Sequence, residues 1–292
     1  MVIDSHLHVW SSTRPYAAGK EPPAALGDSV ASAEALAAGM ESLGIDGALV
    51  VQPINYEFDH AYVSSVLAKD RRFKGMALAD PSDATGARLR EVLESDKDGW
   101  VGVRFNPYLW PEAAREGAWL ADDAGLKLLE VCHDLGGLPI GVMAFGGLKP
   151  LLGSIEALLA HPKAVPIVID HWGFPRENPG APPSADLAFD EGAFEALLDL
   201  GRKHANVHVK VSALFRVSRE SAPYADLEPR FAALLAAFGA KRLMWGSDFP
   251  FVTQQPGGQG ASLDAVAKFC ARLPEADKAA ILGGNAAALF KF

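Results

Sequence analysis

Two histidines separated by a single leucine close the first apolar stretch of the chain, MVIDSHLHVW. Because side chains alternate between the two faces of a β-strand, His6 and His8 are expected to point the same way, and Asp4 with them. Ring nitrogens and carboxylate oxygens on one face can move protons or hold a divalent metal ion. Such a face is a poor way to fill a core, so this stretch predicts a functional site.

Polar or ionisable side chains recur at the ends of four other candidate strands: Arg104 and Asn106, His171, Lys210 and Ser212, and Asp248. Within each pair the two residues are two positions apart, so they share a face of their strand. A single residue of this kind could be accidental. Five strands that carry them at the same end indicate a common site.

The elements that would position these residues alternate regularly along the chain. Eight short β-branched runs are expected to be strands, at 2–9, 47–53, 74–80, 101–106, 138–143, 165–171, 207–213 and 242–248. The stretches between them have the i, i+3, i+4 apolar spacing of helices, as over 58–70, 117–135, 150–160 and 229–238. This alternation predicts an α/β fold, a (β/α)8 TIM barrel in which residues 1–292 form a single domain.

Long segments rich in glycine and proline follow three of the expected strands, at 11–30, 173–190 and 253–262. In a barrel, the loops at the carboxyl ends of the strands build the active site. We therefore expect these three segments to recognise the substrate.

The composition is that of a folded protein with a large core, since 49% of the residues are apolar and 22% are charged. The 27 basic and 36 acidic side chains give a net charge of −9. This charge argues against nucleic acid or an anionic membrane as the main partner, and it leaves room for a pocket that binds a small anionic substrate.

Cys132 and Cys270 lack the spacing of a metal site, so they are expected to be buried thiols in a reducing compartment. The opening stretch MVIDSHLHVW does not have the pattern expected of a signal peptide, and no run of about 18 apolar residues is present. These features predict a cytoplasmic protein, or an organellar one whose transit peptide has been removed. The sequence leaves the oligomeric state open, with a homodimer as the commonest symmetric assembly.

Several motifs, taken in order, resemble the amidohydrolase superfamily: DSHLHVW, VGVRFNP, IVIDHWG, VHVKVSALFRVS, RLMWGSDFPF and GGNAAALF. The resemblance spans nearly the whole chain. It is greatest to the metal-dependent-hydrolase-like branch, which holds sugar lactonases, 2-pyrone-4,6-dicarboxylate lactonase and aromatic acid decarboxylases. It implies a barrel enzyme whose site includes His6, His8, His171 and Asp248.

In metal-using members of that branch, the first-strand histidine pair, a fifth-strand histidine, a sixth-strand histidine and the eighth-strand aspartate surround one or two divalent ions. This chain departs at the fifth strand, where Met143 stands near the expected histidine. A thioether is a poor ligand for such cations, and the pyrone lactonase works without a metal. The sequence thus predicts either no cofactor or one weakly held divalent ion such as zinc, bound by His6, His8 and Asp248.

Each candidate also has a purely structural interpretation. His6 and His8 could be hydrogen-bonded core histidines, His171 could hold a loop, and Asp248 could cap the turn before Pro250. For these four residues we favour the functional interpretation, because they occur together.

The remaining candidates are more evenly balanced. Arg104 and Lys210 are predicted to bind the substrate, but both could instead form ion pairs inside the barrel. Asn106 is predicted to line the pocket, and Tyr108 and Trp110 could line it or simply pack.

The leading functional hypothesis is hydrolysis of a lactone or related cyclic ester. Asp248 would act as general base on a water molecule, and His6, His8 and His171 would donate hydrogen bonds to the carbonyl oxygen. Arg104 would orient an anionic substituent. A bound metal ion would replace the histidines in polarising the carbonyl.

Two alternatives stay open. One is zinc-dependent, non-oxidative decarboxylation of an aromatic or muconate-type acid, against which the absent fifth-strand histidine counts. The other is a barrel that binds a small anion or a partner protein without catalysis.

Overall fold

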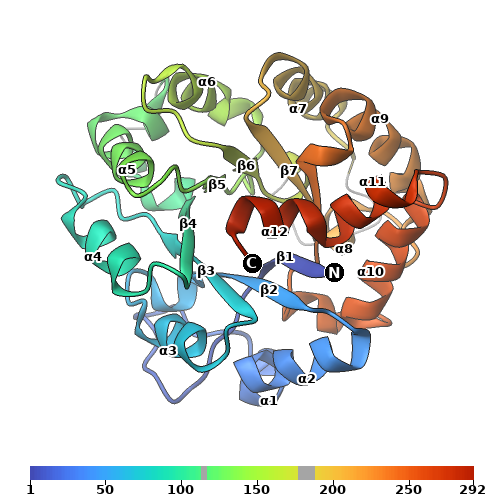
Figure 1. Cartoon of the computed structure of the whole chain (residues 1–292), viewed down its shortest axis with the longest axis horizontal. Helices are drawn as coiled ribbons and strands as arrows, with labels where there is room; N and C mark the ends of the chain where they lie inside the picture. The colour runs from blue at the N-terminus through green and yellow to red at the C-terminus, as the bar shows by residue number, and fades with distance from the viewer. Residues whose placement is uncertain (113–116, 177–187) are drawn as a thin grey trace.

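The sequence order of the strands is also their spatial order, and neighbouring strands are parallel (Figure 1). The computed structural model describes residues 1–112, 117–176 and 188–292. Its strands are β1 (Ile3–Leu7), β2 (Gly47–Val51), β3 (Phe73–Leu78), β4 (Trp100–Phe105), β5 (Ile140–Val142), β6 (Ile167–Ile169), β7 (Val207–Ser212) and β8 (Leu243–Gly246). Each strand falls within one of the predicted ranges or overlaps it closely, so the predicted (β/α)8 barrel is confirmed.

Helices follow the strands and surround the barrel (Figure 1). They are α1 (Asp28–Ala31), α2 (Ala33–Leu43), α3 (Ala61–Lys69), α4 (Ala87–Ser95), α5 (Asp123–Asp134), α6 (Leu152–Ala160), α7 (Glu191–Lys203), α8 (Leu214–Val217), α9 (Glu228–Phe238), α10 (Gly258–Phe269), α11 (Glu275–Ala279) and α12 (Asn285–Phe290). Among the described residues, no helix is both long enough and apolar enough to span a bilayer. Cys132 and Cys270 are buried free thiols, as expected.

The barrel closes where β8 returns to β1. The backbone N–H of Asp248 donates to the carbonyl of His6 over 2.9 Å, and that of His8 donates to the carbonyl of Phe249 over 2.7 Å. Gly246 makes this approach possible, since a Cβ there would lie 2.9 Å from the backbone nitrogen of His6. The closure therefore sets the first-strand histidines directly beside the eighth-strand aspartate.

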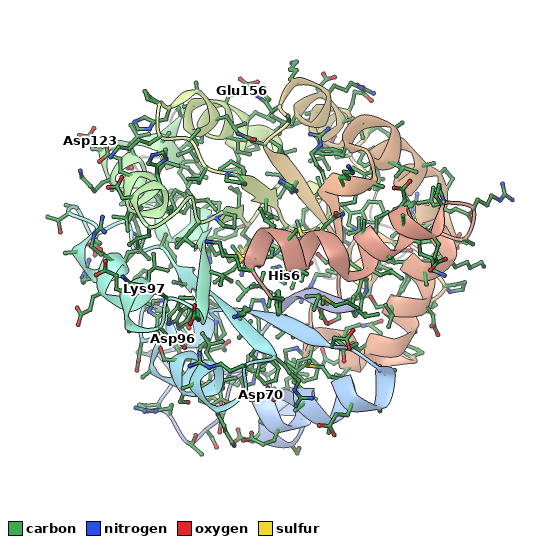
Figure 2. The ribbon with its side chains drawn as sticks, viewed as in Figure 1. His6, Asp70, Asp96, Lys97, Asp123 and Glu156 are labelled. Carbon is green, nitrogen blue, oxygen red and sulfur yellow. The ribbon has the colours of Figure 1, made fainter. Side chains whose placement is uncertain are left out.

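Apolar side chains fill the end of the barrel opposite the candidate site. This cluster contains Ile3, Leu49, Val51, Met76, Val101, Val168, Met244, Ala286 and Phe290. The last two belong to α12, which crosses that mouth of the barrel (Figure 1). His6 lies near the barrel axis, while charged residues such as Asp70, Lys97 and Asp123 lie outside the ring of strands (Figure 2). The barrel is thus a packed core, and its buried ionisable groups adjoin this cluster where Nζ of Lys210 lies 3.7 Å from Sδ of Met76.

The prediction that Asp4 points with the two histidines of β1 is wrong. The pairing of β1 with β2 shifts register between Asp4 and Leu7, and this irregularity interrupts strict alternation. The Asp4 carboxylate accepts hydrogen bonds from the backbone nitrogen of Ser247 (2.9 Å) and from Nε2 of Gln259 on α10 (2.8 Å). Asp4 therefore joins β8 and α10 to the first strand.

Most of the predicted substrate loop 173–190 lies outside the described residues, which omit 177–187. The other two predicted loops are described. The segment 11–30 runs into the short helix α1, whereas residues 258–262 of the segment 253–262 already belong to α10, so that loop is shorter than predicted. They lie at the same end of the barrel as the polar residues, since each follows the carboxyl end of a strand.

Candidate active site

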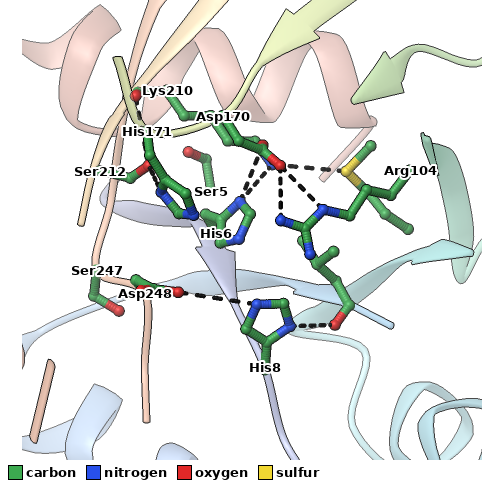
Figure 3. A network of polar contacts seen from close by, with 12 residues as sticks. Ser5, His6, His8, Arg104, Asp170, His171, Lys210, Ser212, Ser247 and Asp248 are labelled. Carbon is green, nitrogen blue, oxygen red and sulfur yellow. Dashed lines mark hydrogen bonds and ion pairs between the residues drawn. The ribbon is translucent and has the colours of Figure 1, made fainter. Parts of the chain in front are cut away.

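The four residues expected to form the site come together at the carboxyl ends of the strands (Figure 3). The ring of His6 has its centroid 4.3 Å from that of His171 and 5.2 Å from that of His8. Nε2 of His8 lies 3.9 Å from Oδ1 of Asp248. All four residues are buried, and His8, the most exposed, retains 8% of its surface.

The hydrogen bond of His8 defines which of its ring nitrogens carries the proton. Nδ1 lies 2.8 Å from the carbonyl oxygen of Val51, which can only accept, so Nδ1 must donate. Burial, together with the nearby charge of Arg104, lowers the pKa of His8 to about 3, so the ring is neutral. Nε2 then carries a lone pair. Contrary to the prediction that His8 donates to a substrate carbonyl, it is built to accept a proton or to ligate a metal ion.

Behind His8, the side chain of His6 meets a buried carboxylate and a buried amine. Its Nδ1 lies 3.2 Å from Oδ1 of Asp170 and 3.1 Å from Nζ of Lys210 (Figure 3). Burial lowers the pKa of His6 well below its ordinary value, so this ring is also neutral. If Nδ1 donates to Asp170, Nε2 presents a lone pair. If Lys210 donates to Nδ1, Nε2 presents an N–H instead.

Asp170 is the centre of this inner network. Arg104 approaches its Oδ2 with Nε and Nη2, each at 3.1 Å, and Nζ of Lys210 lies 3.2 Å from Oδ1. Burial alone would raise the pKa of Asp170, but Lys210, His6 and Arg104 hold it well below the usual range. The carboxylate therefore stays ionised and neutralises part of the positive charge within the barrel.

Asp248 has a different partner, Arg216 of α8. Nε of Arg216 donates to Oδ2 of Asp248 over 2.7 Å, which leaves Oδ1 toward His8. Burial raises the pKa of Asp248, and the charge of Arg216 opposes that rise. A raised pKa suits a carboxylate that must take up a proton near neutral pH.

The backbone is strained where it presents His171 and Asp248. His171, Trp172 and Phe174 follow β6 with φ of 50°, 60° and 48°, and Asp248 has φ of 65°. These left-handed conformations are unfavourable for residues with a Cβ and often occur at functional sites. Nδ1 of His171 is held 2.8 Å from the hydroxyl of Ser212.

His6, His8 and Asp248 together could hold a divalent metal ion, because one ligand atom from each lies within 4.8 Å of the others. Nε2 of His6 is buried, and none of the described residues hydrogen-bonds to it. Two imidazoles and a carboxylate are a donor set that zinc accepts. These residues therefore fit a metal ion, although Met143 offers only a thioether where the fifth-strand histidine was expected.

A cavity of about 510 Å³ opens in front of these groups. Asn106 lines it, as predicted, and also caps a short turn by accepting from the backbone nitrogen of Tyr108 (3.1 Å). Arg104 lines it too, and its ion pair with Asp170 is the structural alternative that the sequence left open, so its predicted contact with the substrate stays a prediction. Lys210 is not among the lining residues and is fully buried. Its ion pair with Asp170 matches the structural alternative, and its position does not support the predicted substrate contact. Trp110 is buried against Phe105, again as packing.

Sequence reasoning did not single out Asp170, Arg216 or Lys20. Asp170 could have been suspected, because it precedes His171 at a strand end. Arg216 comes from a short helix after β7, where strand alternation gives no guide to side-chain direction. Lys20 lines the cavity from the long loop after β1.

The chain is similar to three relatives whose names describe lactone chemistry. A 4-sulfomuconolactone hydrolase of Rhizobium radiobacter is 28% identical over 292 residues, which cover 98% of this chain and 89% of the relative. An L-fucono-1,5-lactonase of Burkholderia ambifaria is 35% identical over 147 residues, 47% of this chain and 46% of the relative. The crystal structure of a Pseudomonas putida protein, described as a candidate 2-pyrone-4,6-dicarboxylic acid hydrolase, has 25% identity. It superimposes with a TM-score of 0.68, covering 99% of this chain and 97% of that chain.

A family model described as amidohydrolase matches residues 3–292, which include all the strands of the barrel and all the residues of the candidate site. The resemblance inferred from the motifs is thereby confirmed, and the chain belongs to the amidohydrolase family.

Proposed function

We propose that this protein hydrolyses a lactone that carries an anionic substituent. The observation that carries the proposal is the ion pair of Asp248 with Arg216, which leaves Oδ1 at the cavity beside His8. The names of the relatives support the same chemistry, since each describes hydrolysis of a lactone ring.

In the proposed reaction, Oδ1 of Asp248 removes a proton from a water molecule in the cavity. The water oxygen attacks the lactone carbonyl carbon, and the carbonyl oxygen takes up negative charge. Nε2 of His171, which lines the cavity, would stabilise that charge when it carries a proton, whereas His6 is fully buried and does not line the cavity. The bond between the carbonyl carbon and the ring oxygen then breaks, and Asp248 returns its proton to the leaving oxygen.

A divalent ion such as zinc, held by His6, His8 and Asp248, would polarise the carbonyl and lower the pKa of bound water. In that case Nε2 of His6 would serve as a ligand through its lone pair, and His171 would remain as the histidine able to donate.

Positive groups on the cavity wall support an anionic substrate. Arg104 uses Nε and Nη2 for Asp170, and Arg216 uses Nε for Asp248, so each guanidinium keeps further N–H groups for a ligand. Lys20 stands exposed at the rim, and none of the described acidic residues pairs with it. A carboxylate or sulfonate on the substrate would find hydrogen-bond donors here.

The proposal is tested by assaying carboxylated lactones with a pH indicator, with and without a chelator. Wild-type enzyme should release one proton per ring opened. Asp248→Asn should reduce turnover by at least about 100-fold while the circular dichroism spectrum stays unchanged.

Other outcomes would point to the alternatives. Release of CO2 from an aromatic or muconate-type acid, lost on chelation, would favour the decarboxylase. An Asp248→Asn enzyme as active as the wild type would remove Asp248 as the base. No turnover across the panel would favour a protein that only binds.

A further inference from the structure

The cavity has two aromatic walls, and each begins at one of the site histidines. On one side the ring of His171 contacts Phe174 with centroids 5.2 Å apart, Phe174 contacts Phe145 at 5.0 Å, and Phe145 contacts Tyr108 at 6.4 Å. Tyr108 is 48% exposed, so this wall runs from the buried histidine to the surface.

The second wall starts at His8. Its ring centroid lies 6.2 Å from that of Phe251, which in turn lies 5.7 Å from Trp10. Phe251 comes from the segment after β8, and Trp10 from the segment after β1. Trp10 is buried, so Phe251 supplies most of the accessible surface of this wall, and the wall that begins at His171 is the one that reaches the surface, at Tyr108.

Met143 adds to this apolar lining. It stands at the end of β5, near the position where a histidine was expected, and it lines the cavity together with Phe145. Met143, Phe145 and Phe251 are all partly exposed. Apolar surface that stays in contact with water is stabilised when a ligand covers it, and a thioether adapts readily to a flat partner.

The ring carbons and the thioether of these walls offer no hydrogen bonds to the hydroxyl groups of a sugar. Those hydroxyls would have to reach the polar lining residues Lys20, Asn55 and Asn106, and any left buried without a hydrogen bond would cost affinity. A flat apolar group would cover the exposed ring surfaces without such a loss.

We infer that the natural substrate is a lactone that bears an aryl or similarly flat apolar substituent, held between the two aromatic walls while the lactone ring faces Asp248. This inference rests on the proposed lactonase function and adds the class of substrate. A substrate of this class differs from a sugar lactone, whose ring carries hydroxyl groups instead of a flat apolar group.

The test compares paraconic acid, a lactone with one carboxylate, with its 2-phenyl derivative. The pair shares the ring and the charge, and each rate is divided by the rate of hydrolysis in hydroxide alone. The phenyl compound should have a kcat/KM at least about 10-fold higher. D-Glucono-1,5-lactone should be a poorer substrate than either acid.

Two variants locate the preference in the structure. Phe145→Ala should bring the ratio of the two kcat/KM values close to one, and Phe145→Leu should restore part of it. Phe292→Ala is the matched control, because Phe292 is also partly buried but packs beside Gly47 at the other end of the barrel. It should leave the ratio unchanged.

Binding separates this inference from the proposed function. Calorimetry with the Asp248→Asn enzyme gives the Kd of both acids without turnover. A Kd at least about 10-fold lower for the phenyl compound supports the apolar site even if no lactone is hydrolysed, an outcome that would end only the lactonase proposal. Equal Kd values, or a preference for D-glucono-1,5-lactone, would overturn the inference.

Discussion

Arg216 and Asp248 form an ion pair of 2.7 Å that links the segment after β7 to the segment after β8. The arginine side chain also lies over the ring of Phe251, at 4.6 Å from the centroid. Arg216 thus orients the carboxylate of Asp248, which we propose as general base. Arg216 is in turn held in place by packing against Phe251, which lines the cavity.

Removing this arginine should impair catalysis more than folding. Arg216→Met deletes a charge-assisted hydrogen bond, worth about 1.5–3 kcal/mol, so kcat/KM should fall about 10- to 150-fold. Because Arg216 opposes the rise in the pKa of Asp248, its loss should move the acidic limb of the pH–rate profile to higher pH. Arg216→Lys should recover part of the rate, and a profile that does not move would contradict the assigned pairing.

The inner ion pairs predict unequal effects of two substitutions on stability. Asp170→Asn leaves Arg104 and Lys210 buried without their carboxylate, so the free energy of unfolding should fall by about 3–5 kcal/mol. Lys210→Met leaves Asp170 paired with Arg104 and should cost less than half as much. Urea unfolding measures both.

The same Lys210→Met variant tests the predicted substrate contact. Lys210 is fully buried and does not line the cavity, so KM should stay within about twofold of the wild-type value. A large rise in KM with unchanged stability would restore the substrate-binding role.

His60 should make stability depend on pH. Its Nδ1 contacts the carbonyl of Phe58 (2.9 Å) and its Nε2 accepts from the backbone nitrogen of Leu78 (3.0 Å), so both nitrogens are satisfied in the neutral ring. Burial lowers the pKa of His60 from 6.5 to about 4. Unfolded chains then bind a proton that folded chains do not, so this contribution is present above pH 6.5 and is lost as the pH falls toward 4.

The expected loss is about 2–3 kcal/mol between pH 7.5 and 4.5. His60→Gln should remove that part of the pH dependence, as measured by urea unfolding at the two pH values in the presence of a chelator. His133→Gln, at an exposed histidine of α5, is the control and should behave as the wild type. If the free energy of unfolding falls by the same amount between the two pH values in His60→Gln and in the wild type, His60 does not cause the pH dependence.

Metal binding can be examined apart from activity. If His6, His8 and Asp248 hold zinc, calorimetric titration should give one ion per chain, and His8→Ala should weaken the affinity at least about 10-fold. His133→Ala should not change it. Wild-type affinity in the His8→Ala protein would mean that the ion binds elsewhere.

Much of the fold was predictable because the pattern that specifies it is local. Alternation within each short apolar run located the strands, and the parallel barrel then required His6, His8, His171 and Asp248 to meet at one end. The orientation of Asp4 was not predictable, because a shift in strand register depends on how β1 pairs with β2.

The ion-pair partners of the site residues could not be predicted from the sequence either. Whether Arg104 binds a ligand or a carboxylate depends on Asp170, which lies 66 positions away. The direction of Arg216 depends on a short helix that follows its strand. Ion pairs of this kind depend on tertiary packing, and the spacing of residues along the chain does not predict them.

The meeting of β1 with β8 has a consequence for how activity is acquired. His8 and Asp248, neighbours in the site, lie just after the first and the last strands of the barrel. A growing polypeptide therefore possesses no competent centre until its final strand has been synthesised and has docked on its first. During refolding, catalytic activity should return only when β8 has docked on β1 and the barrel has closed. The recovery of activity would therefore report the rate of barrel closure.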